Sequence, residues 1–145
     1  MFANVVAADH GLIRMLAARG AATPALWRRQ TLRLLADYLH PDHLEEVALG
    51  CSFAALTADA GRGSPAVRAA YGRAFDELVA QLLRRFGETA DRARVRASAK
   101  QREAAAQVAM VAIGSLIIGA ALGGGPAARA ALAAAWSNVR ERMDQ

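Results

Sequence analysis

The residues best suited to metal or nucleophilic chemistry gather around one proline. His40 and His43 flank Pro41 with Asp42 between them, and Cys51 follows. Imidazole, carboxylate and thiolate groups bind zinc, and a thiolate beside a histidine can act as a nucleophile. Histidines three residues apart share one face only on a helix, and Pro41 breaks the helix here. We therefore expect a solvated loop without a metal site, and a packing role for Cys51.

Two other segments carry groups of the kind that bind phosphate. The glycine loop at residues 61–64 precedes a predicted helix, but it lacks the lysine and the preceding strand of a phosphate-binding P-loop. Arg92, Arg96 and Lys100 lie on one stripe of another predicted helix, without interleaved aromatic residues or base-reading amides. We interpret these segments as a turn and a solvated helix face. Because no base, nucleophile and orienting group support one another, we expect neither an enzyme nor a cofactor.

The composition indicates one globular domain. The 145 residues are 54% hydrophobic and 21% charged, and this length suffices for one continuous core, so we expect a single domain over residues 1–145. The formal net charge is +5, but the arginines that carry it are scattered, which makes them weak evidence for nucleic-acid binding. Cys51 is the only cysteine, which excludes an intramolecular disulfide and favours a reducing, cytoplasmic setting.

Helical periodicity recurs along the chain, and no segment alternates apolar and polar residues as a strand would, so we expect an all-α fold. Ser64 followed by Pro65 is the clearest helix start, because serine caps helices and proline suits a first turn. Pro41 and the glycines at 123–125 mark helix ends. The predicted helices cover residues 5–18, 24–40, 51–60, 65–86, 92–123 and 126–143.

An uncharged run from residue 104 to residue 128 raises the question of a membrane span. The run is long enough to cross a bilayer. However, it is rich in alanine and glycine, no Trp or Tyr lies at either end, and the acidic Glu103 lies beside it. We expect a helix buried in a soluble protein. The alternative is a membrane-associated helical protein that inserts residues 104–125.

A helix over residues 104–123 is apolar on every side and must be covered on every side. One domain of this size can cover only part of it, so we expect a homodimer in which this helix and the last one pair with their copies in a four-helix bundle. Such an interface buries about 2,000 Å² or more. The predicted interface combines a stripe of small residues with a seam on the last helix, namely Ala105, Ala109, Ala112, Leu116, Gly119, Leu132, Trp136 and Val139.

Residues 32–86 resemble the middle of the effector-binding domain of TetR-family transcriptional regulators. The likeness rests on the order of motifs, which are a helix ending in Tyr-Leu, a proline loop, a Gly-Cys pair that opens a short helix, and a Ser-Pro-capped long helix. The uncharged helix and the last helix occupy the places of the family's two dimerisation helices. The resemblance covers about residues 24–143, and the matching residues are Tyr38, Leu39, Pro41, Gly50, Cys51, Ser64, Pro65, Val67 and Arg68.

The resemblance implies a sensing module that binds a small apolar or aromatic effector and dimerises. Tyr38 and Tyr71 support this expectation, because each offers a hydroxyl within an otherwise apolar stripe. The candidate pocket residues are Trp27, Leu34, Tyr38, Cys51, Leu56, Tyr71, Phe75 and Met110.

The family's DNA-binding head is the part of the resemblance that this chain lacks. Members begin with a three-helix head of about fifty residues that contains a helix-turn-helix, and residues 1–23 are too few to supply it. The chain is a relative without a head, a protein whose start lies further upstream, or the regulatory domain taken alone. We expect DNA contact only through a head absent from this chain.

Overall fold

The computed structural model describes residues 11–46 and 52–144. This part of the chain contains helices and no strand, which confirms the expected all-α class. The elements are α2 (Gly11–Ala17), α3 (Pro24–Tyr38), the 3-10 helix η1 (Pro41–Glu46), α5 (Ser52–Gly61), α6 (Pro65–Leu83), α7 (Ala90–Arg96), α8 (Ala99–Ala121) and α9 (Gly125–Met143).

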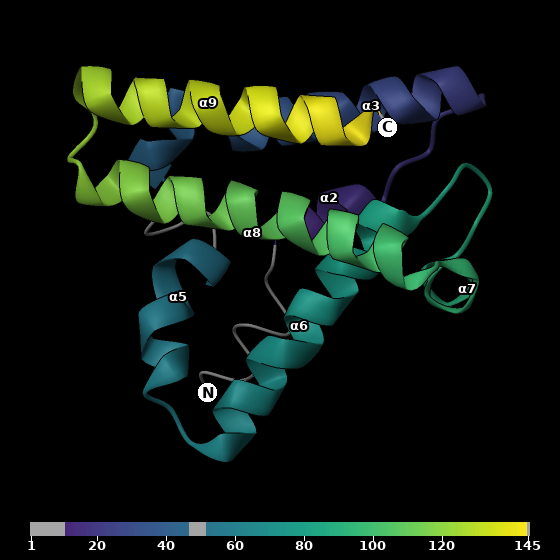
Figure 1. The fold of residues 1–145 in the computed structure, drawn as a ribbon, viewed down its shortest axis with the longest axis horizontal. Coiled ribbons are helices and arrows are strands. Elements are labelled where there is room, and N and C mark those ends of the chain that lie inside the picture. Colours follow the sequence, from purple (N-terminus) through teal and green to yellow (C-terminus); the bar gives the residue numbers. More distant parts are fainter. Residues whose placement is uncertain (1–10, 47–51, 145) are drawn as a thin grey trace.

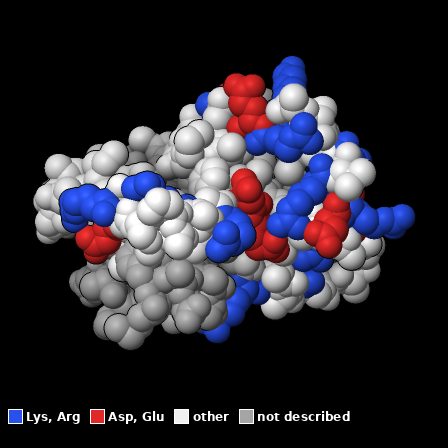
Figure 2. Space-filling view, turned by 90° about the horizontal axis from the view of Figure 1, so that it is seen from below, with Lys and Arg blue, Asp and Glu red and all other residues white. Residues whose placement is uncertain are grey.

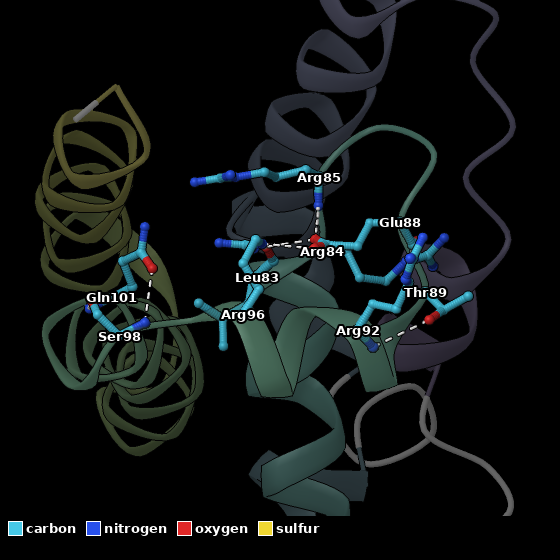
Figure 3. Close-up of polar contacts among 9 residues, drawn as sticks. All are labelled: Leu83, Arg84, Arg85, Glu88, Thr89, Arg92, Arg96, Ser98 and Gln101. Carbon is cyan, nitrogen blue, oxygen red and sulfur yellow. Dashed lines mark hydrogen bonds and ion pairs between the residues drawn. The ribbon is translucent and has the colours of Figure 1, made fainter.

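Side-chain caps fix the starts of four helices. Ser64 caps α6 as predicted, because its hydroxyl accepts a hydrogen bond from the backbone N–H of Val67 and Pro65 occupies the first turn. The same contact, between a Ser or Thr side chain and the N–H three residues later, starts α3, α7 and α8. Figure 3 shows it for Thr89 at α7.

The prediction of a single helix over residues 92–123 is wrong. It is split into α7 and α8, because the backbone is extended at Ala97 (ψ 134°) and Ser98 (ψ 164°). Ser98 and Gln101 form a reciprocal capping box, in which each side chain bonds the backbone N–H of the other residue. The helix expected to reach residue 86 also ends earlier, at Leu83, and the chain then turns through Gly87 at φ 76°.

Helix α8 organises the fold (Figure 1). It runs antiparallel to α9, and the two lie side by side in front of α2 and α3. On the side away from α9, α8 is joined by α5 and α6, and it also contacts η1. Five helices each contribute a fully buried leucine to the core, namely Leu16, Leu35, Leu78, Leu116 and Leu132.

Close packing on α8 depends on small residues. A Cβ atom placed on Gly119 would lie 2.9 Å from Cδ2 of Leu44, so η1 rests directly on the helix at this position. Ala109 and Ala112 are 1% exposed in the same core. The small stripe of α8 therefore serves contacts within the chain.

Candidate functional site

The outward side of α8 carries an exposed apolar ridge. Met110, Ile118 and Leu122 are 54%, 55% and 50% exposed. Gly114 lies between them, and a Cβ atom placed on it would meet nothing within 4 Å. These four residues are four positions apart, so they follow one line along the helix. We call this line, Met110–Gly114–Ile118–Leu122, the outer ridge.

The segments of α8 and α9 that accompany the outer ridge carry long uncharged runs. No charged residue lies between Glu103 and Arg129, and none lies between Arg129 and Arg140. Because α8 and α9 are antiparallel, the charged start of α8 lies beside the charged end of α9, where Arg142 donates a hydrogen bond to Gln107. Figure 2, which views the molecule from the side of α5 and α6, likewise shows charged side chains crowded toward the end that carries α7.

Helix Ala99–Ala121 meets the length and composition of a membrane span, and it is the one helix in the described part of the chain that does. Within its most apolar window, 44% of the residues are buried inside the protein. A wholly buried core helix would be covered on all sides. The outer ridge is therefore an apolar surface that the described part of this chain leaves uncovered.

The residues predicted to form the dimer interface lie elsewhere, on the inner sides of α8 and α9. Because α5, α6, α9 and η1 of the same chain pack against α8, its small stripe is already buried, and a second copy cannot reach these side chains in this conformation. Trp136 is half-buried against the same core. The buried members are Ala105, Ala109, Ala112, Leu116, Gly119, Leu132 and Val139.

Five of the eight predicted pocket residues pack in or against one core cluster. Tyr38 is a buried member of this cluster, and Leu34, Leu56, Tyr71 and Phe75 are half-buried against it. The hydroxyl groups of Tyr71 and Thr57 are hydrogen-bonded at 2.9 Å, which ties α6 to α5. Leu56, Tyr71 and Phe75 thus lie where α5 and α6 face the core, and we call these three side chains the aromatic group.

The other three predicted pocket residues are not part of this group. Trp27 is buried beneath the guanidinium of Arg19, 4.1 Å from the ring centre, and it meets Phe86 edge-on at 6.3 Å. Met110 points outward on the outer ridge. Cys51 lies outside the described residues.

The histidine segment forms a turn of 3-10 helix where we expected a solvated loop. His43 is half-buried, its ring lies 5.0 Å from that of Tyr38, and its Nδ1 lies 2.8 Å from the Tyr38 carbonyl oxygen. The exposed His40 accepts a hydrogen bond from the backbone N–H of Asp42 at 3.2 Å. Among residues 11–46 and 52–144, no group of three His, Cys, Asp or Glu side chains is arranged to hold a metal ion.

The buried Arg19 is a feature that the sequence analysis missed. It is 6% exposed, and it donates three hydrogen bonds of 2.7 Å, to the Leu16 carbonyl, the Thr31 hydroxyl and the Gln81 carbonyl. Burial, together with the nearby charge of Arg84, lowers the pKa of Arg19 to about 10. Arg19 joins the end of α2 to α3 and α6, and no local pattern marks it among the other scattered arginines.

Glu88 is the centre of a second polar contact, at the turn between α6 and α7 (Figure 3). It accepts hydrogen bonds from the Arg96 guanidinium at 2.6 Å and 3.1 Å and from the backbone N–H of Arg85 at 2.9 Å. The Arg96 hydrogen bond lowers the pKa of Glu88 and raises that of Arg96. The predicted stripe of Arg92, Arg96 and Lys100 is not one solvated helix face. Arg96 is paired with Glu88, and Lys100 lies on α8, whereas the two arginines lie on α7.

Comparisons of the chain with known protein families, with curated proteins and with solved structures give no match. The outer ridge and the aromatic group where α5 and α6 meet the core are the structural features that bear on function.

Proposed function

We propose that this chain is the ligand-sensing and dimerisation module of a TetR-like transcriptional regulator. The observation that carries the proposal is the outer ridge, which is apolar, uncharged and lies beside α9. Contiguous apolar patches on a protein surface mark interaction sites. A second copy of the chain is the partner that offers the same apolar surface.

The arrangement of α8 and α9 supports a two-fold dimer. Two antiparallel helix pairs placed face to face make a four-helix bundle, in which the outer ridge of each copy meets the bundle centre. Gly114 allows the two backbones to approach closely, because it carries no side chain on the line of contact. We therefore place the proposed interface on the outer ridge, and not on the small stripe predicted from the sequence, which is buried within the chain.

Sensing is assigned to the aromatic group of Leu56, Tyr71 and Phe75. These side chains combine apolar area with the Tyr71–Thr57 hydroxyl pair, which suits a small apolar or aromatic effector that carries one polar group. Among the described side chains of this region, none provides a nucleophile with a supporting base, so we assign it binding and not catalysis.

Dimerisation is tested with two glycines that share one environment in the chain. Gly114 on α8 and Gly72 on α6 both lie inside helices, and a Cβ atom meets nothing within 4 Å at either position. Replacing either glycine with arginine should leave the monomer folded, because arginine has a higher helix propensity than glycine. Light scattering at micromolar concentration should give two chains for wild type and for Gly72→Arg, and one chain for Gly114→Arg. A wild-type monomer would end the dimer proposal.

Sensing is tested by thermal shift with a panel of small aromatic compounds. A ligand that binds only the folded state raises the melting temperature by mass action. We expect Tyr71→Ala and Phe75→Ala to reduce the shift, and Phe86→Ala, whose ring packs against Trp27, to retain it. Shifts that are equal in all three variants would remove the aromatic group from the proposal.

The second candidate is a membrane-associated protein, and the observation that favours it is the partly uncovered apolar helix Ala99–Ala121. A membrane could cover the outer ridge instead of a second chain. Cell fractionation separates the two functions, because the dimer should stay in the supernatant without detergent, whereas a membrane-associated protein should sediment with vesicles. For a membrane-associated protein, Gly114→Arg should reduce sedimentation with vesicles and leave the oligomeric state unchanged.

A further inference from the structure

A hollow of about 300 Å³ opens where the end of α6, α7, the start of α8 and the end of α9 meet. Its apolar lining includes the buried Leu82, Ala105 and Val108 together with Met143. The rest of the lining is strongly cationic and contains no acidic residue, since its polar members are Arg84, Arg85, Arg96, Arg142 and Gln101.

Three of the four arginines around the hollow form no salt bridge with a carboxylate in the described part of the chain. Arg96 is paired with Glu88. Arg84 donates to the amide oxygen of Gln81 at 2.8 Å and to the backbone carbonyls of Glu88 and Ala17. Arg142 donates to the amide oxygens of Asn138 and Gln107. These neutral acceptors hold the guanidinium groups in place without cancelling their charge.

Arg85 is the most available of the four. Its backbone N–H donates to Glu88, and its charge helps to lower the pKa of that carboxyl, but its guanidinium makes no hydrogen bond or salt bridge with a described residue. In Figure 3 the Arg85 side chain extends from the end of α6 toward the side of the view that contains Gln101, at the start of α8. A guanidinium without an internal hydrogen bond, next to an apolar lining, can bind an anionic group and break no contact within the protein.

From this geometry we propose that the hollow binds a small amphiphilic carboxylate. The planar guanidinium matches a carboxylate through two parallel hydrogen bonds, so Arg85 and Arg142 bind the head group. The tail lies over Leu82, Val108 and Met143, where it loses contact with water. The volume lies at the lower end of the range for small-molecule sites, which suits a short tail and not a nucleotide.

This site is separate from both parts of the proposed function. Val108 and Met110 are two residues apart, so they point about 200° apart around α8. The hollow therefore lies on the side of α8 away from the outer ridge, and Tyr71 and Phe75 do not line it. Binding here does not require a dimer, so a chain that proves monomeric would still bind the carboxylate.

Calorimetry at low salt with octanoate as the probe tests the site. We expect saturable binding of one octanoate per chain at pH 7, where the carboxylate is ionised. Acetate, which lacks the tail, and octylammonium, which carries the opposite charge, should give no saturable binding.

Arg85→Gln should weaken octanoate binding by about tenfold, as expected for a lost charge-assisted hydrogen bond. Its fold should be intact, because the Arg85 side chain holds nothing in place. Arg73→Gln is the matched control, an exposed arginine on α6 away from the hollow, and its affinity should equal that of wild type. The inference is overturned if octanoate does not bind, if octylammonium binds equally well, or if binding depends on Tyr71 and not on Arg85.

Discussion

Replacing the buried Arg19 tests how a single guanidinium joins three helices. Arg19→Met keeps the length and apolar stem of the side chain over Trp27 but removes three hydrogen bonds of 2.7 Å. Arg19→Lys keeps the positive charge, but one ammonium group cannot copy the planar fork that reaches all three acceptors. The two variants therefore separate the value of the charge from the value of its geometry.

The expected cost follows from two opposing contributions. Hydrogen bonds to a charged group are worth about 1.5–3 kcal/mol each, so three contribute about 5–9 kcal/mol. Against this, burial and Arg84 lower the pKa of Arg19 to about 10, which corresponds to about 3 kcal/mol of penalty on the charged form. Arg19→Met should therefore destabilise the fold by about 2–6 kcal/mol. Arg19→Lys should cost as much or more, because it keeps the buried charge and loses most of its partners.

Urea unfolding followed by circular dichroism measures these differences as changes in the free energy of unfolding. Arg33→Met is the matched control, because Arg33 is exposed on α3, and its stability should match that of wild type within about 0.5 kcal/mol. An Arg19→Met protein as stable as wild type would refute the reasoning, since desolvation would then cancel all three hydrogen bonds. A fully stable Arg19→Lys would show that the fork geometry is unimportant.

Three further substitutions probe other parts of the fold. The lowered pKa of Glu88 means that its contribution to stability is present above its unfolded pKa and is lost as pH falls through its folded pKa. Wild type should thus be more stable than Glu88→Gln at pH 7, and urea titrations should show the difference shrinking below about pH 4. Ala112→Arg places a charge in the core and should give insoluble or unfolded protein by light scattering and circular dichroism, whereas Gly114→Arg, two residues away, should stay folded. Gly119→Val crowds Leu44 and should cost about 1–3 kcal/mol, with faster hydrogen exchange in η1.

Helix starts were the most predictable part of the fold, because capping is a local interaction. Ser64 and Pro65 lie next to each other, and their chemistry alone marks the start of α6. The break between α7 and α8 carries a similar local signal, a serine followed three residues later by a glutamine, but the continuous helical periodicity on both sides hid it. The all-α class followed from the same periodicity.

Most residues of the predicted interface are buried within the chain, which helical periodicity could not foresee. A helix that is apolar all round shows no preferred face, so the sequence did not distinguish residues covered by α9 of the same chain from residues left outside. The small stripe at Ala109 and Ala112 looked suited to a partner because close approach needs small residues. The same property suits α9 within the chain. Arg19 and the arginines around the hollow were equally hidden, because their positions depend on contacts between distant elements.

The two sides of α8 imply different roles in folding and association. Its inner side packs against α5, α6, α9 and η1, so elements of one chain bury Leu116 and Leu132. Its outer ridge lies outside that core, so a second copy would add buried area without completing the monomer. An obligate dimer whose partner supplied part of the core would unfold as it dissociates. Dilution of the proposed dimer should instead release a folded monomer, so that its affinity responds to ligands without loss of the fold. The measurement is helical circular dichroism across the concentration range in which light scattering shows dissociation, and a fall in helicity together with mass would show that the ridge belongs to a shared core.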